Sequence, residues 1–259
     1  SRALNGEARN SLKALTGNIA PLLVMALMMA LVIVSIAAVS LAMGSRAEMV
    51  QMREGLRMED EILSNFYLRP QSGIDLRGVP VAYGSPSARV TIVEYFSFDC
   101  SVCRRAKDVL KAIVDKYPGK VRVYLKNYPP DVSCIAPNPA MEPNPACRAA
   151  LLSIALRGSR AYMNFVEYLM SQRLHISPQM IEVALANSGV NRAALQSLMP
   201  EREAVRILAG EITEAGSLRI EGTPTFVVNG RALPSGLPPF YFFDRLIGME
   251  VSRVYGQGR

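Results

Sequence analysis

The sequence predicts an α/β domain that follows a long N-terminal helix. Three observations indicate this: an uncharged apolar stretch near the N-terminus, a strand–helix–strand pattern over residues 88–125, and β-type residues at 225–233 after a long helical block. With 259 residues, half of them hydrophobic, the chain is long enough for one well-buried domain plus an additional segment.

The net charge of +7 does not indicate a nucleic-acid partner. Lysines and arginines are scattered singly among acids, and no nucleic-acid-binding module is recognisable. We therefore expect no nucleic-acid binding. A basic chain that also carries an apolar span more naturally lies beside anionic lipid or an acidic partner.

The apolar stretch predicts a transmembrane helix at 19–43, after a cytoplasmic tail at 1–18, and so a lipid bilayer as partner. The uncharged run opens after Lys13 and closes before Arg46, and a bilayer is crossed by roughly 20 residues. A cleaved signal peptide is the alternative, but its apolar core is roughly 7 to 15 residues. Basic residues flank both ends equally, so the positive-inside rule gives no orientation.

Residues 44–83 are expected to form a stalk helix and a linker. Apolar residues recur near heptad spacing in the first part, and Glu59 interrupts their stripe. We expect a stalk packed on the protein's own domain or on another membrane subunit. A self-dimerising coil is the alternative, but it needs roughly three to four sustained heptads. Pro70 ends the helix, and a glycine- and proline-rich linker follows.

The folded domain is expected over residues 84–259. Residues 88–98, ARVTIVEYFSF, are rich in β-branched and aromatic side chains and predict a buried central strand. An amphipathic helix and a second strand at 121–125 complete a right-handed parallel unit. Residues 146–218 predict a helical insertion of four or five short helices. The chain then returns to strands at 225–233 and ends in a helix at 241–254.

Cys100 and Cys103 form a C-x-x-C motif where the first strand meets its helix. One helical turn brings the two sulfurs within bonding range. The helix N-terminus favours a thiolate at Cys100, the expected nucleophile, and Cys103 would resolve the mixed disulfide. Arg104, Arg105 and Lys107 either add positive potential or form the solvated face of the helix.

A zinc half-site and an inert disulfide are the alternatives for this pair. Zinc takes about four ligands, and the one histidine, His175, falls in the helical block. Cys134 and Cys147 would have to complete a four-cysteine site, although they follow a different strand and lack short ligand spacing. We therefore expect no metal and no other cofactor.

Two motifs resemble the DsbA-like branch of the thioredoxin superfamily. VEYFSFDCSVC, residues 93–103, resembles its active-site strand, and IEGTPTFVVNG, residues 220–230, resembles its cis-proline loop. Both motifs with a helical insertion between them are more specific than a bare C-x-x-C, and the resemblance covers roughly 84–254. It implies a thioredoxin-like fold and disulfide exchange with protein thiols, with oxidase, reductase and isomerase directions left open.

The resemblance also implies a substrate-binding loop. In the family pattern Pro224 follows a cis peptide bond and places Thr223 against the cysteine pair, where its backbone is free to bind an extended substrate strand. An ordinary trans turn is the alternative.

A buried acid is the third implied element. Glu94 occupies the position of the family's buried carboxyl, whose pKa is raised by burial so that it takes the proton from Cys103. A paired surface acid is the alternative. The dipeptide Ser101-Val102 replaces the proline and histidine typical of strongly oxidising members. We therefore expect a less acidic Cys100 and a more reducing potential than theirs.

Cys134 and Cys147 bracket a proline-rich segment that a disulfide would close. Such a cross-link contributes about 3 kcal/mol in the chain-entropy model, and we expect this structural role. A redox relay is the alternative, because a similar loop pair occurs in thioredoxin-like proteins that resemble partners of vitamin K epoxide reductase-type membrane enzymes. Four pairable cysteines suit an oxidising compartment.

The sequence therefore predicts a membrane-anchored thiol–disulfide oxidoreductase. Its domain would lie on the periplasmic or extracellular face of the cell membrane and exchange disulfides with protein thiols, with a membrane redox partner or a larger membrane complex as further partners. The alternative is a noncatalytic subunit or assembly factor of a larger membrane complex. Copper delivery is a weaker alternative, because the usual supporting histidine is missing.

Overall fold

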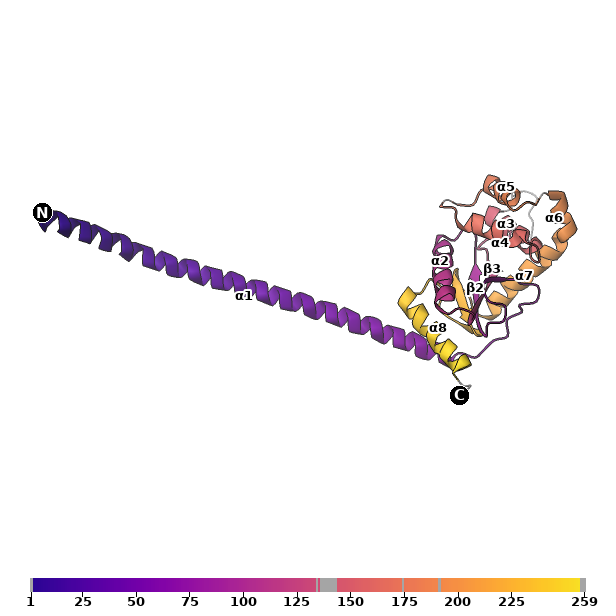
Figure 1. Cartoon of the computed structure of the whole chain (residues 1–259), viewed down its shortest axis with the longest axis horizontal. Coiled ribbons are helices and arrows are strands. Elements are labelled where there is room, and N and C mark those ends of the chain that lie inside the picture. The colour runs from indigo at the N-terminus through magenta and orange to yellow at the C-terminus, as the bar shows by residue number, and fades with distance from the viewer. Residues whose placement is uncertain (1, 134, 136–143, 174, 191, 257–259) are drawn as a thin grey trace. The chain divides into compact units, whose positions relative to one another are not determined.

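The structure is a computed structural model of the chain. It describes residues 2–133, 135, 144–173, 175–190 and 192–256 (Figure 1). The chain divides into two units, Ser1–Glu61 and Ile62–Arg259.

The first unit consists of one continuous helix, which extends into the second unit. Helix α1 (Arg2–Leu68) shows no break between the expected span and the expected stalk. Its apolar part, within Pro21–Leu68, reaches a mean hydropathy of 3.0, and no part of that window is buried inside the structure. Leu41, for example, is 75% exposed. Because unburied apolar surface is unfavourable in water, a helix of this length and composition is suited to a bilayer.

The second unit begins inside the last turns of α1. Leu63 is 5% exposed and Phe66 only 1%, and both belong to the main core. We expected the folded domain to begin at residue 84, but the compact unit begins at Ile62. The linker expected before residue 84 is also different in the structure, because part of it forms an additional strand.

A five-stranded sheet lies at the centre of the second unit, in the order β1-β3-β2-β4-β5 (Figure 1). Strands β2 and β3 are parallel, and the other neighbouring pairs are antiparallel. The strands are β1 (Val81–Gly84), β2 (Val90–Phe96), β3 (Val121–Asn127), β4 (Thr225–Val228) and β5 (Arg231–Ala232).

Strand β1 is the element that the sequence analysis missed. It is four residues long and lies in a stretch rich in turn-forming residues. Gly84 has a φ of +88°, and a Cβ there would lie 2.2 Å from the carbonyl oxygen of Val121. Only glycine therefore fits this close approach to β3.

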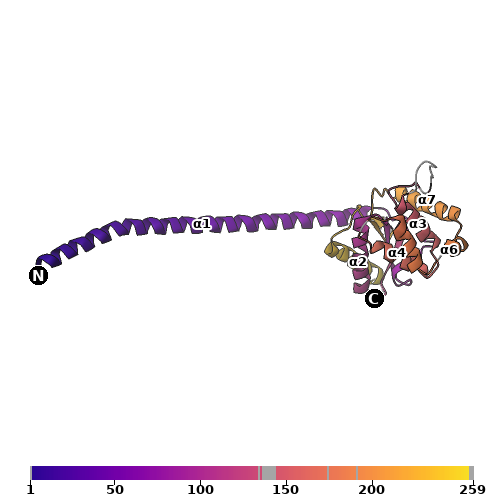
Figure 2. The ribbon, with the colours of Figure 1, turned by 90° about the horizontal axis from the view of Figure 1, so that it is seen from above.

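Helices cover both faces of the sheet (Figure 1). Helices α2 (Ser101–Lys116) and α8 (Phe240–Tyr255) contribute to the core on one face, and the C-terminal end of α7 (Glu201–Ser217) contributes to the core on the other. The insertion expected at 146–218 is helical, and its helices gather together (Figure 2). Besides α7 they are α3 (Pro145–Ala155), α4 (Ala161–Met170), α5 (Pro178–Asn187) and α6 (Arg192–Leu198).

Candidate thiol–disulfide site

Cys100 is the N-cap residue of α2, directly after the turn that leaves β2. Its backbone is extended, with φ −82° and ψ 110°, and its Sγ accepts a hydrogen bond from the backbone N–H of Cys103 at 3.2 Å. N-cap side chains usually satisfy a free backbone donor through oxygen. Here sulfur takes that role, so a negative charge on Sγ meets a backbone donor and the positive end of the helix dipole.

These contacts lower the pKa of Cys100 from 9.0 to about 6. The hydrogen bond with the side chain of Cys103 contributes most, and the side chain of Thr223 and the backbone N–H groups of Val102 and Cys103 add to it. Partial burial opposes this shift without cancelling it. Cys100 is therefore mostly a thiolate at neutral pH, and it remains partly accessible to solvent.

Cys103 lies one turn further along α2 and is fully buried. Burial raises the pKa of Cys103 far above its ordinary value, and the hydrogen bond with Cys100 and the charge of Glu94 raise it further. Both cysteines are free thiols in this structure. The pair is therefore unequal, with one accessible acidic thiol and one shielded thiol that keeps its proton.

The loop before β4 faces the cysteine pair. The Thr223–Pro224 peptide bond is cis, as the resemblance implied. The Sγ of Cys100 donates to the carbonyl oxygen of Thr223 at 3.3 Å. Two hydrogen bonds hold the loop in place: Gly236 N donates to Pro224 O at 2.7 Å, and Thr225 Oγ1 donates to Gly222 O at 2.7 Å.

Glu94 is buried on the same face of β2 as the main core. Its neighbours across the sheet are the apolar residues Leu125 and Phe226, and it is 1% exposed. Among the described residues its Oε1 has no hydrogen-bond partner. Burial raises the pKa of Glu94 well above its usual range, and the charge of Cys100 adds to the effect. The alternative of a paired surface acid is therefore wrong.

The basic residues after Cys103 do not act as one group. Arg104 donates from Nη1 to the carbonyl oxygen of Phe98 at 2.9 Å. Arg105 is exposed. Lys107 has a side chain only 16% exposed, and its Nζ lies 3.7 Å from a carboxylate oxygen of Glu167. The alternative of a solvated face is therefore wrong for Lys107.

His175 lies beside the motif, which the sequence analysis did not foresee. Its Nδ1 is 2.8 Å from Oδ1 of Asp99, the residue before Cys100. The backbone N–H of Ile176 donates to the same oxygen at 3.2 Å. The imidazole itself is 89% exposed. No local pattern in the sequence could indicate this contact, because 76 positions separate its two residues.

The second cysteine pair is only partly described. Cys147 is disulfide-bonded and fully buried at the start of α3. Cys134, its expected partner, lies outside the described residues. A disulfide leaves Cys147 no thiolate to offer a metal, which removes the four-cysteine zinc alternative.

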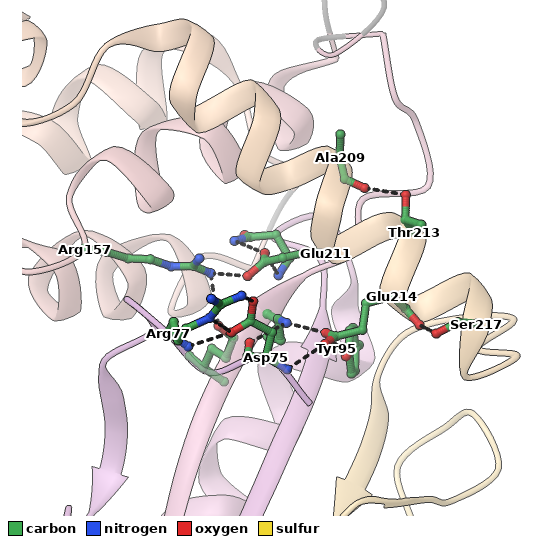
Figure 3. A network of polar contacts seen from close by, with 12 residues as sticks. Asp75, Arg77, Tyr95, Arg157, Ala209, Glu211, Thr213, Glu214 and Ser217 are labelled. Atoms are coloured by element: carbon green, nitrogen blue, oxygen red, sulfur yellow. Dashed lines mark hydrogen bonds and ion pairs between the residues drawn. The ribbon is translucent and has the colours of Figure 1, made fainter. Parts of the chain in front are cut away.

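A buried ionic network holds the end of β3 on the other face of the sheet (Figure 3). The guanidinium of Arg157 donates to Oε1 of Glu211 at 2.7 Å, and both side chains are 4% exposed. Oε2 of Glu211 accepts from the backbone N–H of Asn127 at 2.8 Å. Lys126 and Tyr95 both bond to Glu214. These charged groups line a cavity of about 490 Å³, and because they are paired with one another, we assign the network a structural role.

Three features define the thioredoxin-like class of thiol proteins. They are a mixed sheet of this order, a C-x-x-C motif at a strand–helix junction, and a cis-proline loop opposite that motif. A family model described as thioredoxin matches residues 77–237. The chain belongs to this thioredoxin family, and Cys100 and Cys103 are its C-x-x-C thiol pair. No curated protein matched the chain.

Solved structures agree with this assignment. A thioredoxin-like oxidoreductase from Silicibacter pomeroyi DSS-3 is 25% identical to this chain. The match covers 67% of this chain and 92% of the Silicibacter protein, with a TM-score of 0.54. A periplasmic thioredoxin-like protein from Salmonella enterica serovar Typhimurium is 19% identical. The match covers 68% of this chain and 91% of the Salmonella protein, with a TM-score of 0.54. The thiol-disulfide exchange protein alpha-DsbA2 from Wolbachia pipientis is 16% identical. The match covers 70% of this chain and 88% of the Wolbachia protein, with a TM-score of 0.55. The last two likenesses concern the fold alone.

Proposed function

We propose that this protein is anchored in a membrane by residues 19–43 and exchanges disulfides with protein substrates outside the cytoplasm. The observation that carries the proposal is the inequality of the cysteine pair. Cys100 accepts a backbone hydrogen bond and has a pKa lowered to about 6, whereas Cys103 is buried and has a raised pKa. Such a pair suits an attacking thiolate backed by a resolving thiol.

Each partner residue has one role in this proposal. The thiolate of Cys100 attacks a substrate disulfide and forms a mixed disulfide. The sulfur of Cys103 then attacks Cys100, and its proton passes to Glu94 as the substrate leaves as a thiolate. In the opposite direction, a substrate thiolate attacks the Cys100–Cys103 disulfide and Glu94 returns the proton. The Thr223–Pro224 loop binds the substrate backbone as an added strand.

The direction of exchange depends on how strongly the reduced form is stabilised. A pKa of about 6 at Cys100 lies between the free value and the value near 3.5 of a strongly oxidising DsbA. This supports a potential more reducing than that of the strongest oxidases. The partner in the membrane or compartment then sets the net direction.

Two observations support the location. The apolar helix has the length and hydropathy of a membrane span, and a disulfide at Cys147 suits an oxidising compartment. The Salmonella protein of similar fold is described as periplasmic. A retained anchor fits a single helix that runs without a break from the apolar segment into the folded unit.

Activity of the full chain in detergent tests the chemistry. Reduction of a protein disulfide and equilibration with glutathione should both be lost in Cys100→Ser. Cys103→Ser should instead accumulate mixed disulfides with substrates, visible as adducts on non-reducing gels. Full activity in Cys100→Ser would sink the mechanism.

Labelling of intact cells tests the location. A membrane-impermeant maleimide should modify Cys100 in cells whose cytoplasmic membrane is intact, and Cys100→Ser should remove that label. The protein should also stay with the membrane after alkaline extraction. Labelling only after lysis would place the domain in the cytosol, and release on extraction would show that the helix is not an anchor.

A further inference from the structure

The residue before the nucleophile is tied to the helical insertion. Oδ1 of Asp99 lies 2.8 Å from Nδ1 of His175, and it accepts a hydrogen bond from the backbone N–H of Ile176 at 3.2 Å. Asp99 is joined to Cys100 by a peptide bond. One residue and one hydrogen bond therefore connect the nucleophile to the one histidine of the chain.

The hydrogen bond with Asp99 determines which nitrogen of the ring is free. A carboxylate can only accept, so the proton of the neutral ring is on Nδ1 and Nε2 keeps its lone pair. Asp99 thus holds the tautomer in which Nε2 is a base, as an aspartate does for the histidine of a Ser-His-Asp triad. The imidazole of His175 is 89% exposed, so Nε2 is open to a molecule bound at Cys100.

The segment after His175 fixes the position of the ring. Ile176 is buried and belongs to the main core. Ser177 is the N-cap residue of α5, and its Oγ accepts from the backbone N–H of Met180 at 3.3 Å. The imidazole is therefore exposed on an anchored backbone. It is oriented without being covered, as a group that acts on a bound substrate must be.

The sulfur of a substrate comes close to this ring. Neighbouring Cα atoms are about 3.8 Å apart, and from Asp99 one short side chain and the 2.8 Å hydrogen bond lead to the imidazole. A sulfur that attacks Cys100 arrives from solvent, because Cys103 on the inner side is fully buried. The ring is open to the same solvent, and base catalysis operates at hydrogen-bond distance or through one water.

A substrate thiol needs a base when it attacks the oxidised pair. Only the thiolate attacks, and a free thiol with a pKa of about 8.5 is only about 3% ionised at pH 7. Glu94 is buried and serves Cys103 in the proposed function, on which this inference rests. We propose that His175 is the catalytic base that takes the proton of the substrate thiol as its sulfur attacks Cys100, and that Asp99 is the positioning residue that holds its tautomer.

The step balances in atoms and electrons. The substrate S–H bond breaks and its proton passes to Nε2 of His175, while the substrate sulfur bonds to the Sγ of Cys100. The Cys100–Cys103 bond breaks, and its electron pair stays on the sulfur of Cys103, which takes the proton of Glu94. A second substrate thiol loses its proton to solvent and attacks the mixed disulfide. Cys100 then leaves as a thiolate, the substrate is oxidised to a disulfide, and His175 gives its proton to water.

Two thiols of different acidity test the assignment. Oxidised full chain in detergent is mixed at pH 7 with reduced glutathione, whose thiol is mostly protonated, or with thionitrobenzoate, which is already ionised. His175→Asn keeps an amide that can donate to Asp99 but has no base. Its rate with glutathione should fall about tenfold, within the roughly thirtyfold that supplying the thiolate can gain. Its rate with thionitrobenzoate should stay at the wild-type value, because that thiol has no proton to give.

Further variants separate a base from a structural or electrostatic role. Asp99→Asn should change the ratio of the two rates in the same direction, because the tautomer is no longer held. Free imidazole should restore part of the glutathione rate of His175→Ala, since the ring it replaces is exposed. Arg173→Gln is the matched control, because Arg173 is exposed two positions away on the same segment. Its loss of charge should leave the ratio at the wild-type value.

The outcomes distinguish this inference from the proposed function. A wild-type ratio in both His175→Asn and Asp99→Asn overturns the inference, while reactivity of the wild type with both thiols leaves the proposed function in place. Equal slowing with both thiols in His175→Asn also overturns it, because a merely structural role predicts that result. If the oxidised wild type reacts with neither thiol, the proposed function falls and the inference falls with it.

Discussion

The Sγ of Cys100 lies 3.3 Å from the carbonyl oxygen of Thr223, across 123 positions of sequence. A thiol can donate to that oxygen, but a thiolate cannot. Ionisation of Cys100 therefore ends this bond, while the backbone N–H of Cys103 still donates to the sulfur. The Thr223 carbonyl is then free to accept an N–H from an extended substrate strand. With substrate docking at this loop as proposed above, the same proton would control both the nucleophilicity of Cys100 and the docking of substrate.

Alkylation of Cys100 should follow a titration near pH 6. The pKa of about 6 makes the thiol roughly nine-tenths ionised at pH 7. The rate of reaction with iodoacetamide should be nearly constant above pH 7 and fall about tenfold per pH unit below 6. Cys103→Ala should move the midpoint upward, because the largest cause of the shift is the hydrogen bond with Cys103. A midpoint near 9 in the wild type would contradict the assigned contacts.

The same shift makes the stability of the reduced protein depend on pH. The folded pKa of Cys100 lies below its unfolded value, so the unfolded state binds more protons between about pH 6 and 9. The free energy of unfolding should therefore rise with pH through this window, relative to Cys100→Ser. The contribution is complete above the unfolded pKa and lost as pH falls through about 6. Denaturant titrations that give parallel curves for the two proteins would refute it.

Breaking the buried pair of Arg157 and Glu211 should destabilise the domain. Both side chains are 4% exposed, so Glu211→Gln leaves a buried cation without its counter-charge. The expected loss is about 3–5 kcal/mol in the free energy of unfolding. Glu203→Gln on the same helix is the control, because its partner Arg206 is 72% exposed and surface pairs contribute little. Equal effects of the two variants would argue against the network's structural role.

The end of α1 should behave as part of the folded unit. Phe66 is 1% exposed in the core, so Phe66→Ala should lower the free energy of unfolding by about 3–5 kcal/mol. Met52→Ala, at a side chain 68% exposed, should change it by less than about 0.5 kcal/mol. Denaturation of the full chain in detergent measures both. A negligible effect of Phe66→Ala would mean that the compact unit begins after the helix.

Local patterns predicted the parts of the site that depend on neighbouring residues. The strand–helix junction placed Cys100 at a helix N-terminus, and the family resemblance of the strand motif placed Glu94 at a buried position. Packing between distant segments could not be predicted in the same way. Tyr83 lies on a four-residue edge strand hidden among turn-forming residues, and its partner Glu167 is 84 positions away. His175 meets Asp99 only because the helical insertion folds back on the motif.

The pH dependence of the free energy of unfolding tests whether the pKa of Glu94 is raised in the folded protein. Burial raises its folded pKa well above 4.5, so between these two pKa values the folded protein holds a proton that the unfolded chain has lost. The stability of the oxidised protein, in which neither active-site thiol titrates, should therefore fall as pH rises above about 5, by at most about 1.4 kcal/mol per pH unit relative to Glu94→Gln. Urea titrations of both proteins from pH 4 to 9 measure this difference. The two curves should meet at low pH and diverge as pH increases, because only the wild type carries an ionisable group at this position. A constant difference across the range would mean that Glu94 ionises as readily in the folded protein as in water, and it could not then store the proton of Cys103.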